Sequence, residues 1–128
     1  MSDKQAQSKT GEFCWNELIT GDVAKAKEFY GKLLGWEHED VNMGEFTYTM
    51  FKQGDKQVCG MMQSPQAGTP PHWMSYISVA DIQAALKKAK SLGAEEVVPV
   101  TPVGDFGKLF VVKDPTGAHI AFWESLKK

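Results

Sequence analysis

The strongest constraint on the fold is a pattern that the chain contains twice. Each copy consists of a strand-like run, an aspartate where a helix N-cap belongs, an apolar helical spacing and a glycine that ends the helix. The aspartates, Asp22 and Asp81, are 59 residues apart, and the glycines, Gly35 and Gly93, are 58 apart. This agreement in register favours an internal duplication over two unrelated strand-helix pieces.

Strand-like segments complete each copy. The first strand of each copy spans residues 13–19 and 72–79, and the expected helices follow Asp22 and Asp81. Three more strands come after each helix, at residues 36–41, 46–53 and 56–63, and at 95–100, 108–114 and 118–124. The spacing therefore predicts an α+β fold of two βαβββ modules. We expect a flexible tail at 1–11 and one domain at 12–125, with module one at 12–63, a linker at 64–71 and module two at 72–125.

Composition and charge argue against nucleic-acid and membrane partners. The chain has 128 residues, 42% of them hydrophobic, which is enough for a core. Fourteen basic and sixteen acidic residues give a net charge of -2, without the basic cluster that binds nucleic acid. No run approaches the roughly 20 apolar residues of a membrane span, and MSDKQAQSKTGE is unlike a secretory signal. We therefore expect a cytoplasmic protein with no nucleic-acid or membrane partner. Cys14 and Cys59 lie in apolar runs and are expected to be reduced thiols.

Three segments resemble a known superfamily. GDVAKAKEFYGKLLGWE, SVADIQAALKKAKSLGAE and KDPTGAHIAFWE are similar to the vicinal oxygen chelate superfamily, which includes glyoxalase I, bleomycin-resistance proteins, extradiol dioxygenases and methylmalonyl-CoA epimerase. The resemblance covers about residues 12–125. It implies mixed sheets that curl into a cup, with the ligand site between the modules, and a homodimer. The segments indicate the superfamily but do not select a member.

The resemblance also implies where a catalytic metal would bind. In metal-dependent members the ligands come from the first and last strand of each module, and here these positions hold Trp15, Gly60, Met74 and Ala121. None of these side chains is a metal ligand of the His or carboxylate kind. If the alignment with the family is shifted by one residue, the metal positions hold no better ligands: Cys14 or Asn16, Trp73 or Ser75, and Ile120 or Phe122. We expect no cofactor, with a divalent metal possible only at displaced positions.

Strand alternation predicts which side chains face the ligand, because residues two apart share a face. The face that carries Trp15, Met74 and Ala121 also carries Phe13, Glu17, His72, Tyr76, His119 and Trp123. The opposite face carries Cys14, Leu18, Ile77, Ile120 and Phe122, which suits packing against helices. The first face has the aromatic composition of a small-molecule pocket. The alternative is that the aromatic rings fill the cup as a core.

The titratable residues on that face leave several roles open. His72 and His119 each lie two residues before a position aligned with the family's metal ligands, so they are expected at the same level on neighbouring parallel strands. With Glu17 they would resemble a two-His, one-carboxylate set. The simpler interpretation is two histidines near a strand entrance. A carboxylate partly removed from water can act as an acid or base, so Glu17 is also a candidate by itself, or a hydrogen-bonded carboxylate of the pocket wall.

Two functions from different classes follow. The first is a binding module of the bleomycin-resistance kind, which takes up a small aromatic or amphipathic molecule without the family's usual metal. The second is a lyase or isomerase of the glyoxalase class, or a relative of the dioxygenases, which uses a displaced metal or Glu17 as base. Residues 102–109 are expected to form a hairpin or a lid.

Overall fold

The computed structural model describes residues 9–64 and 68–126. Residues 65–67 of the expected linker and 1–8 of the expected tail lie outside these ranges. The chain divides into two compact units. The N-terminal unit is Asn16–Met74, and the C-terminal unit comprises the described residues of Ser75–Lys128 and of Met1–Trp15.

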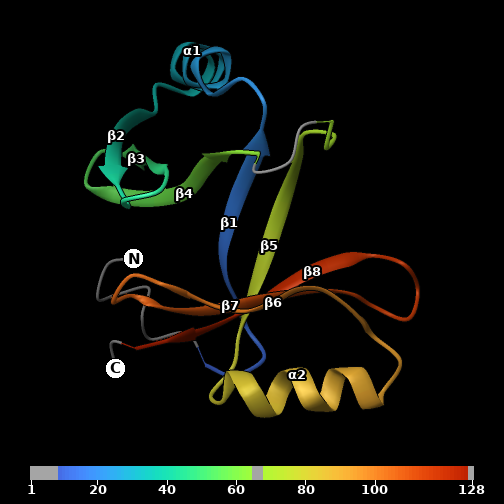
Figure 1. Cartoon of the computed structure of the whole chain (residues 1–128). Coiled ribbons are helices and arrows are strands. Elements are labelled where there is room, and N and C mark those ends of the chain that lie inside the picture. Colours follow the sequence, from blue (N-terminus) through green and yellow to red (C-terminus); the bar gives the residue numbers. More distant parts are fainter. Residues whose placement is uncertain (1–8, 65–67, 127–128) are drawn as a thin grey trace. The chain divides into compact units, whose positions relative to one another are not determined.

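The predicted order of elements is confirmed (Figure 1). The first five elements are β1 (Phe13–Thr20), α1 (Val23–Leu34), β2 (Glu37–Asn42), β3 (Thr47–Gln53) and β4 (Lys56–Gln63). The next five are β5 (His72–Ser78), α2 (Ile82–Ser91), β6 (Glu95–Val103), β7 (Gly107–Lys113) and β8 (His119–Ser125). The chain is therefore α+β, with βαβββ twice. The segment at 102–109 is the β6–β7 hairpin.

The helices begin at the predicted caps. The Asp22 carboxylate accepts a hydrogen bond from the Lys25 backbone N–H at 2.9 Å, and the Asp81 carboxylate accepts one from the Ala84 N–H at 3.1 Å. Gly35 ends α1 with φ 75°, in the left-handed region that glycine enters at little cost. In the described part of the chain, no helix is long and apolar enough to cross a membrane.

Each half has a mixed sheet with the same topology. The strand order is β2-β3-β4-β1 in the first half and β5-β8-β7-β6 in the second. The first and last strands are parallel, with Glu17 opposite Gly60 and Tyr76 opposite Ala121, and the other pairs are antiparallel. A parallel pair needs a long crossover connection. In this chain the crossover contains the helix.

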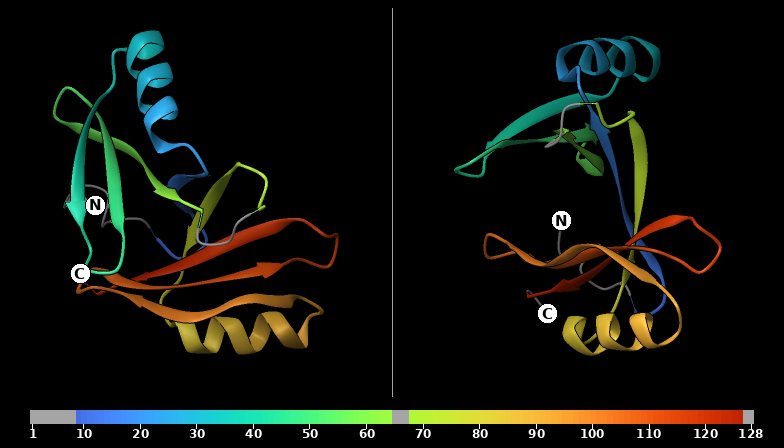
Figure 2. Two further views of the ribbon diagram at one scale, coloured as in Figure 1. Left: turned by 45° about the horizontal axis from the view of Figure 1, so that its top comes forward. Right: turned by 45° about the vertical axis from the view of Figure 1, so that its right-hand side comes forward.

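One face of each sheet packs against its helix. Under α1 the buried residues are Leu18, Phe51, Cys59 and Met61, joined by Val23, Ala26 and Tyr30 of the helix. Along α2 they are Ile82, Phe110 and Val112, joined by Ala85, Leu86, Ile120 and Phe122. Both views in Figure 2 show α2 running along β6 and β7. Leu18, Ile120 and Phe122 thus lie on the helix side, as predicted. We call the opposite side of each sheet its helix-free face.

Two glycines on the helix-free faces lie under aromatic side chains. A Cβ at Gly60 of β4 would overlap the hydroxyl end of the Tyr48 ring, which comes from β3. A Cβ at Gly107 of β7 would overlap both the Trp123 ring of β8 and the backbone oxygen of Glu124. Each glycine therefore provides the space in which a ring lies close to the sheet.

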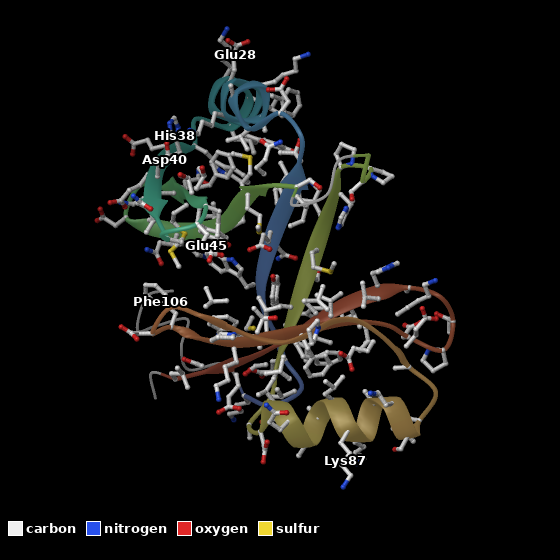
Figure 3. All side chains as sticks on the ribbon, in the orientation of Figure 1. Glu28, His38, Asp40, Glu45, Lys87 and Phe106 are labelled. Atoms are coloured by element: carbon white, nitrogen blue, oxygen red, sulfur yellow. The ribbon has the colours of Figure 1, made fainter. Side chains whose placement is uncertain are left out.

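Asp40 of β2 connects α1 to its sheet (Figure 3). One carboxylate oxygen lies 2.9 Å from the Lys27 ammonium of α1, and the other accepts a hydrogen bond of 2.8 Å from the Thr49 hydroxyl of β3. The hydrogen bond from Lys27, followed by the one from Thr49, lowers the pKa of Asp40 below its ordinary value. The ionised carboxylate therefore stabilises the folded state.

Replacing Asp40 with Asn should weaken this connection in a pH-dependent way. Because the pKa of Asp40 is lowered on folding, its contribution is present above the unfolded pKa of about 3.9 and is lost as pH falls through the folded value. The Asp40 side chain is 45% exposed and screened by solvent, so we expect Asp40→Asn to cost about 0.5 to 1 kcal/mol at pH 7. Urea unfolding at pH 7 and pH 3 measures both values. Glu39→Gln, which removes an exposed pair with Lys52 at 3.9 Å, is the control. A deficit of equal size at both pH values would contradict the linkage.

The two covered glycines should respond differently to alanine. Gly107→Ala meets a backbone oxygen that cannot move without disturbing β8, so we expect a loss of roughly 1 to 3 kcal/mol in unfolding free energy. Gly60→Ala meets the far end of the Tyr48 side chain, which can turn away, so we expect a smaller loss. Urea denaturation of the two variants provides the comparison. An equal or greater loss for Gly60→Ala would show that the Tyr48 ring is rigidly held.

Candidate functional site

The helix-free face of the N-terminal unit centres on Glu17. Met50, Gly60 and Glu17 lie opposite one another across β3, β4 and β1, so their side-chain positions share one face. The Glu17 side chain is buried, at 6% exposure. The Tyr48 hydroxyl lies over Gly60, the strand partner of Glu17. The face thus brings a buried carboxylate and a phenol to neighbouring strand positions.

The helix-free face of the C-terminal unit is apolar and aromatic. One row across its strands contains Tyr76, Ala121 and Val111, all buried, and the next contains Ser78, Trp123 and Leu109. Trp123 lies over Gly107. Its indole Nε1 is buried and has no hydrogen-bond partner among residues 9–64 and 68–126.

The remaining predicted site residues differ in their surroundings. Trp15 is half-buried in β1, and Met74 is buried in β5. His72 is half-buried, and its Nδ1 donates a hydrogen bond of 2.9 Å to the Pro70 carbonyl oxygen. His119, at the start of β8, is exposed.

The expectation that His72 and His119 lie at the same level assumed that Met74 is level with Ala121, and this assumption is wrong by two residues. Tyr76 lies opposite Ala121 in the parallel β5–β8 pair, so the position level with Ala121 is Tyr76, not Met74. The cause is that alternation fixes the face of a side chain and cannot detect a shift of two.

The residues at the family's metal positions do not fit a divalent ion. Trp15, Gly60, Met74 and Ala121 offer an indole, no side chain, a thioether and a methyl group, none of which supplies the imidazole or carboxylate that such an ion prefers. Within the described ranges, no three His, Cys, Asp or Glu side chains come together as a metal site.

The two cysteines are free thiols. Cys14 Sγ lies 3.6 Å from the Tyr76 carbonyl oxygen. Burial raises the pKa of both the Cys14 and the Cys59 thiol to about 11. At neutral pH both are protonated and weakly nucleophilic, so neither is suited to covalent chemistry.

Tyr48 and Gly107 are the residues that sequence reasoning missed. The sequence predicts a strand around Tyr48 and a hairpin or lid around Gly107, and it indicates no site role for either residue. A glycine inside a strand often marks the close approach of another group. That signal was available for Gly60, in the middle of KQVCGMMQ, but the ring that covers it comes from another strand.

Comparison with known proteins places this arrangement in a family. The model of the Glyoxalase/Bleomycin resistance protein/Dioxygenase superfamily matches residues 13–122. CFP32 of Mycobacterium tuberculosis (strain CDC 1551 / Oshkosh), named as a suspected glyoxylase, is 32% identical over 127 residues, covering 95% of this chain and 49% of that protein. The anthracycline biosynthesis protein DnrV of Streptomyces peucetius is 29% identical, covering 88% of this chain and 46% of its own. The chain thus spans about half the length of the curated relatives it matches.

Solved structures share the fold at lower identity. Methylmalonyl-CoA epimerase from Mycobacterium tuberculosis superposes with a TM-score of 0.63 at 15% identity, over 93% of this chain and 91% of the enzyme. The H200E variant of homoprotocatechuate 2,3-dioxygenase from B. fuscum gives a TM-score of 0.61 at 20% identity, over 94% of this chain and 34% of the enzyme. The family match covers most of the chain, and the βαβββ repeat agrees with the fold of these structures. The chain belongs to the Glyoxalase/Bleomycin resistance protein/Dioxygenase superfamily.

Proposed function

We propose that the chain binds a small aromatic or amphipathic molecule on its helix-free faces, without the metal that many family members use. The observation that carries the proposal is repeated in both halves. An aromatic side chain with a polar tip, Tyr48 or Trp123, lies over a strand glycine on the face opposite the helix. The metal-free part of the proposal is supported by the chemistry of Trp15, Gly60, Met74 and Ala121.

This pattern suits a ligand better than a structural core. On the helix faces the buried members of the two core clusters are aliphatic, aromatic, thioether or thiol groups that need no polar partner, and Tyr30 and Trp36 are only partly buried against them. On the helix-free faces a carboxylate, a phenol and an indole N–H are set among apolar groups, the mixture typical of ligand sites. Aromatic rings add roughly 0.5 to 1.5 kcal/mol per stacked pair beyond the burial of area.

The names of relatives agree with an aromatic ligand. DnrV is named for anthracycline biosynthesis, and anthracyclines are polycyclic aromatic compounds. The B. fuscum dioxygenase was solved in complex with HPCA. The curated relatives are about twice as long as this chain. We therefore use their names only as a guide to the chemistry of the ligand, and we do not transfer their activity to this chain.

A thermal-shift screen of flat aromatic compounds tests the proposal, because a ligand of the folded state raises the melting temperature. We expect at least one polycyclic aromatic compound to bind, with the same dissociation constant before and after EDTA treatment.

Trp15→Ala should weaken this binding and leave the protein folded, whereas a core role would cost about 3 to 5 kcal/mol of stability. Elemental analysis should find no stoichiometric divalent ion. A tightly bound ion, or binding that EDTA abolishes, would overturn the metal-free part.

A second candidate function, proton transfer by Glu17, is favoured by one observation. The carboxylate is buried on the helix-free face, opposite a glycine covered by the Tyr48 hydroxyl. A buried carboxylate beside a phenol has the composition of an acid-base pair. In this alternative, Glu17 removes a proton from a carbon next to a carbonyl group of the bound molecule.

Glu17→Gln separates the two functions, because it keeps the shape of the side chain and removes the base. If Glu17 only orients the ligand, the dissociation constant should rise about 10-fold or more, as expected for losing a hydrogen bond to a charged group. Deuterium exchange into the bound compound, followed by NMR in D₂O, reports proton transfer. Exchange that occurs with the parent protein and falls at least about 100-fold in Glu17→Gln would favour the enzyme. The control is Glu28→Gln on the outer side of α1 (Figure 3), which should change neither value.

A further inference from the structure

We propose that Trp123 donates its indole N–H to a neutral carbonyl oxygen of the ligand, so that the ligand is an aromatic ketone or quinone. This inference rests on the proposed function and deepens it, because it names the chemical group that the C-terminal unit recognises.

The first step is the state of the indole nitrogen. An indole N–H can only donate a hydrogen bond, so it is satisfied only when an acceptor lies next to it. Nε1 of Trp123 is buried and forms no hydrogen bond with any described residue. A buried donor without an acceptor destabilises the free protein, because its hydrogen bonds to water are lost and not replaced. An acceptor supplied by a ligand would recover that free energy on binding.

The second step is the rigidity of the donor. The Trp123 backbone is held on both sides, opposite Ser78 of β5 and opposite Leu109 of β7. Its carbonyl oxygen accepts a hydrogen bond of 2.9 Å from the Val79 N–H. The ring occupies the space over Gly107 that a Cβ would fill. A donor fixed in this way loses little entropy when an acceptor arrives.

The third step is the charge of the acceptor. The two rows of the helix-free face nearest Trp123 contain no charged side chain: Tyr76, Ala121, Val111 and Val98 form one, and Ser78, Trp123, Leu109 and Thr101 the other. Glu124, the next residue along β8, points to the helix side, where its carboxylate accepts a hydrogen bond of 2.8 Å from the Ile82 N–H. A carboxylate ligand would enter these rows without a cation, at a high desolvation cost. A ketone or quinone oxygen carries no such cost, and its aromatic frame matches the apolar surroundings.

A matched pair of probes tests the inference. Anthraquinone-2-sulfonate and anthracene-2-sulfonate have the same ring frame and the same sulfonate at one end, so any cost of that charge cancels in the comparison, and they differ in the two carbonyl groups. We expect the quinone to bind roughly 2- to 12-fold more tightly, the range of one net hydrogen bond. In ¹H–¹⁵N spectra the Trp123 indole resonance should move downfield with the quinone and not with the anthracene.

Two variants identify the donor. Trp123→Phe should remove the preference for the quinone. Trp73→Phe should keep it, because Trp73 is partly exposed and its ring contacts Tyr30 of α1. If Trp123→Phe does not fold, the parent protein still decides the question. Its four indole resonances can be assigned by elimination from Phe variants of Trp15, Trp36 and Trp73.

The outcomes separate this inference from the proposed function. Equal affinity for the two probes, with an unshifted Trp123 resonance, would refute carbonyl recognition and leave aromatic binding intact. An N–H that an internal water satisfies would give this same negative result. If neither probe nor any other aromatic compound binds, the proposed function fails together with the inference.

Discussion

The parallel pairing of the first and last strand in each half determines the rest of the architecture. β1 and β4 run in the same direction, as do β5 and β8, so the chain must return along the sheet between them. It does so partly through a helix, and the helix packs on one face. Because the helix covers only one face, the two faces of each sheet differ. One buries an apolar core, and the other is left to side chains that no helix covers.

The unlike sides explain why the polar groups of interest gather where they do. Polar side chains under a helix would compete with a closely packed core. Where α1 meets the edge of its sheet, Asp40 uses one carboxylate oxygen for Lys27 and the other for Thr49. On the helix-free side, Glu17, Tyr48 and Trp123 are set into an apolar surface. The strand glycines let two of the rings lie close to the backbone. Glu17, Tyr48 and Trp123 thus lie on the faces opposite the apolar cores.

Secondary structure was predictable from the sequence because its signals are local. The Asp caps, the Gly35 stop and the hydrophobic periodicities each act over a few residues, and the helices and strands begin and end within a few positions of the expected ones. The faces of β1 and β8 were also predictable, because side chains alternate along a strand, and Leu18 and Phe122 lie on the helix side as expected. The register between β5 and β8 was not, because a shift of two residues leaves every side chain on the same face. The sequence does not predict that Tyr48 covers Gly60 or that Trp123 covers Gly107, because each pairing joins two strands and a single sequence does not show which ring covers which glycine.

The two covered glycines also reveal a difference between the two modules. In the first half the ring comes from β3 and covers a glycine on β4, the last strand of its module. In the second half the ring comes from β8, the last strand, and covers a glycine on β7. The direction in which the ring crosses to its neighbour is therefore reversed between two copies of one motif. The two modules share their connectivity and differ in the strand that presents the aromatic group. A repeat that matches in the register of its caps and strands therefore does not match in the side chains that its helix-free faces present.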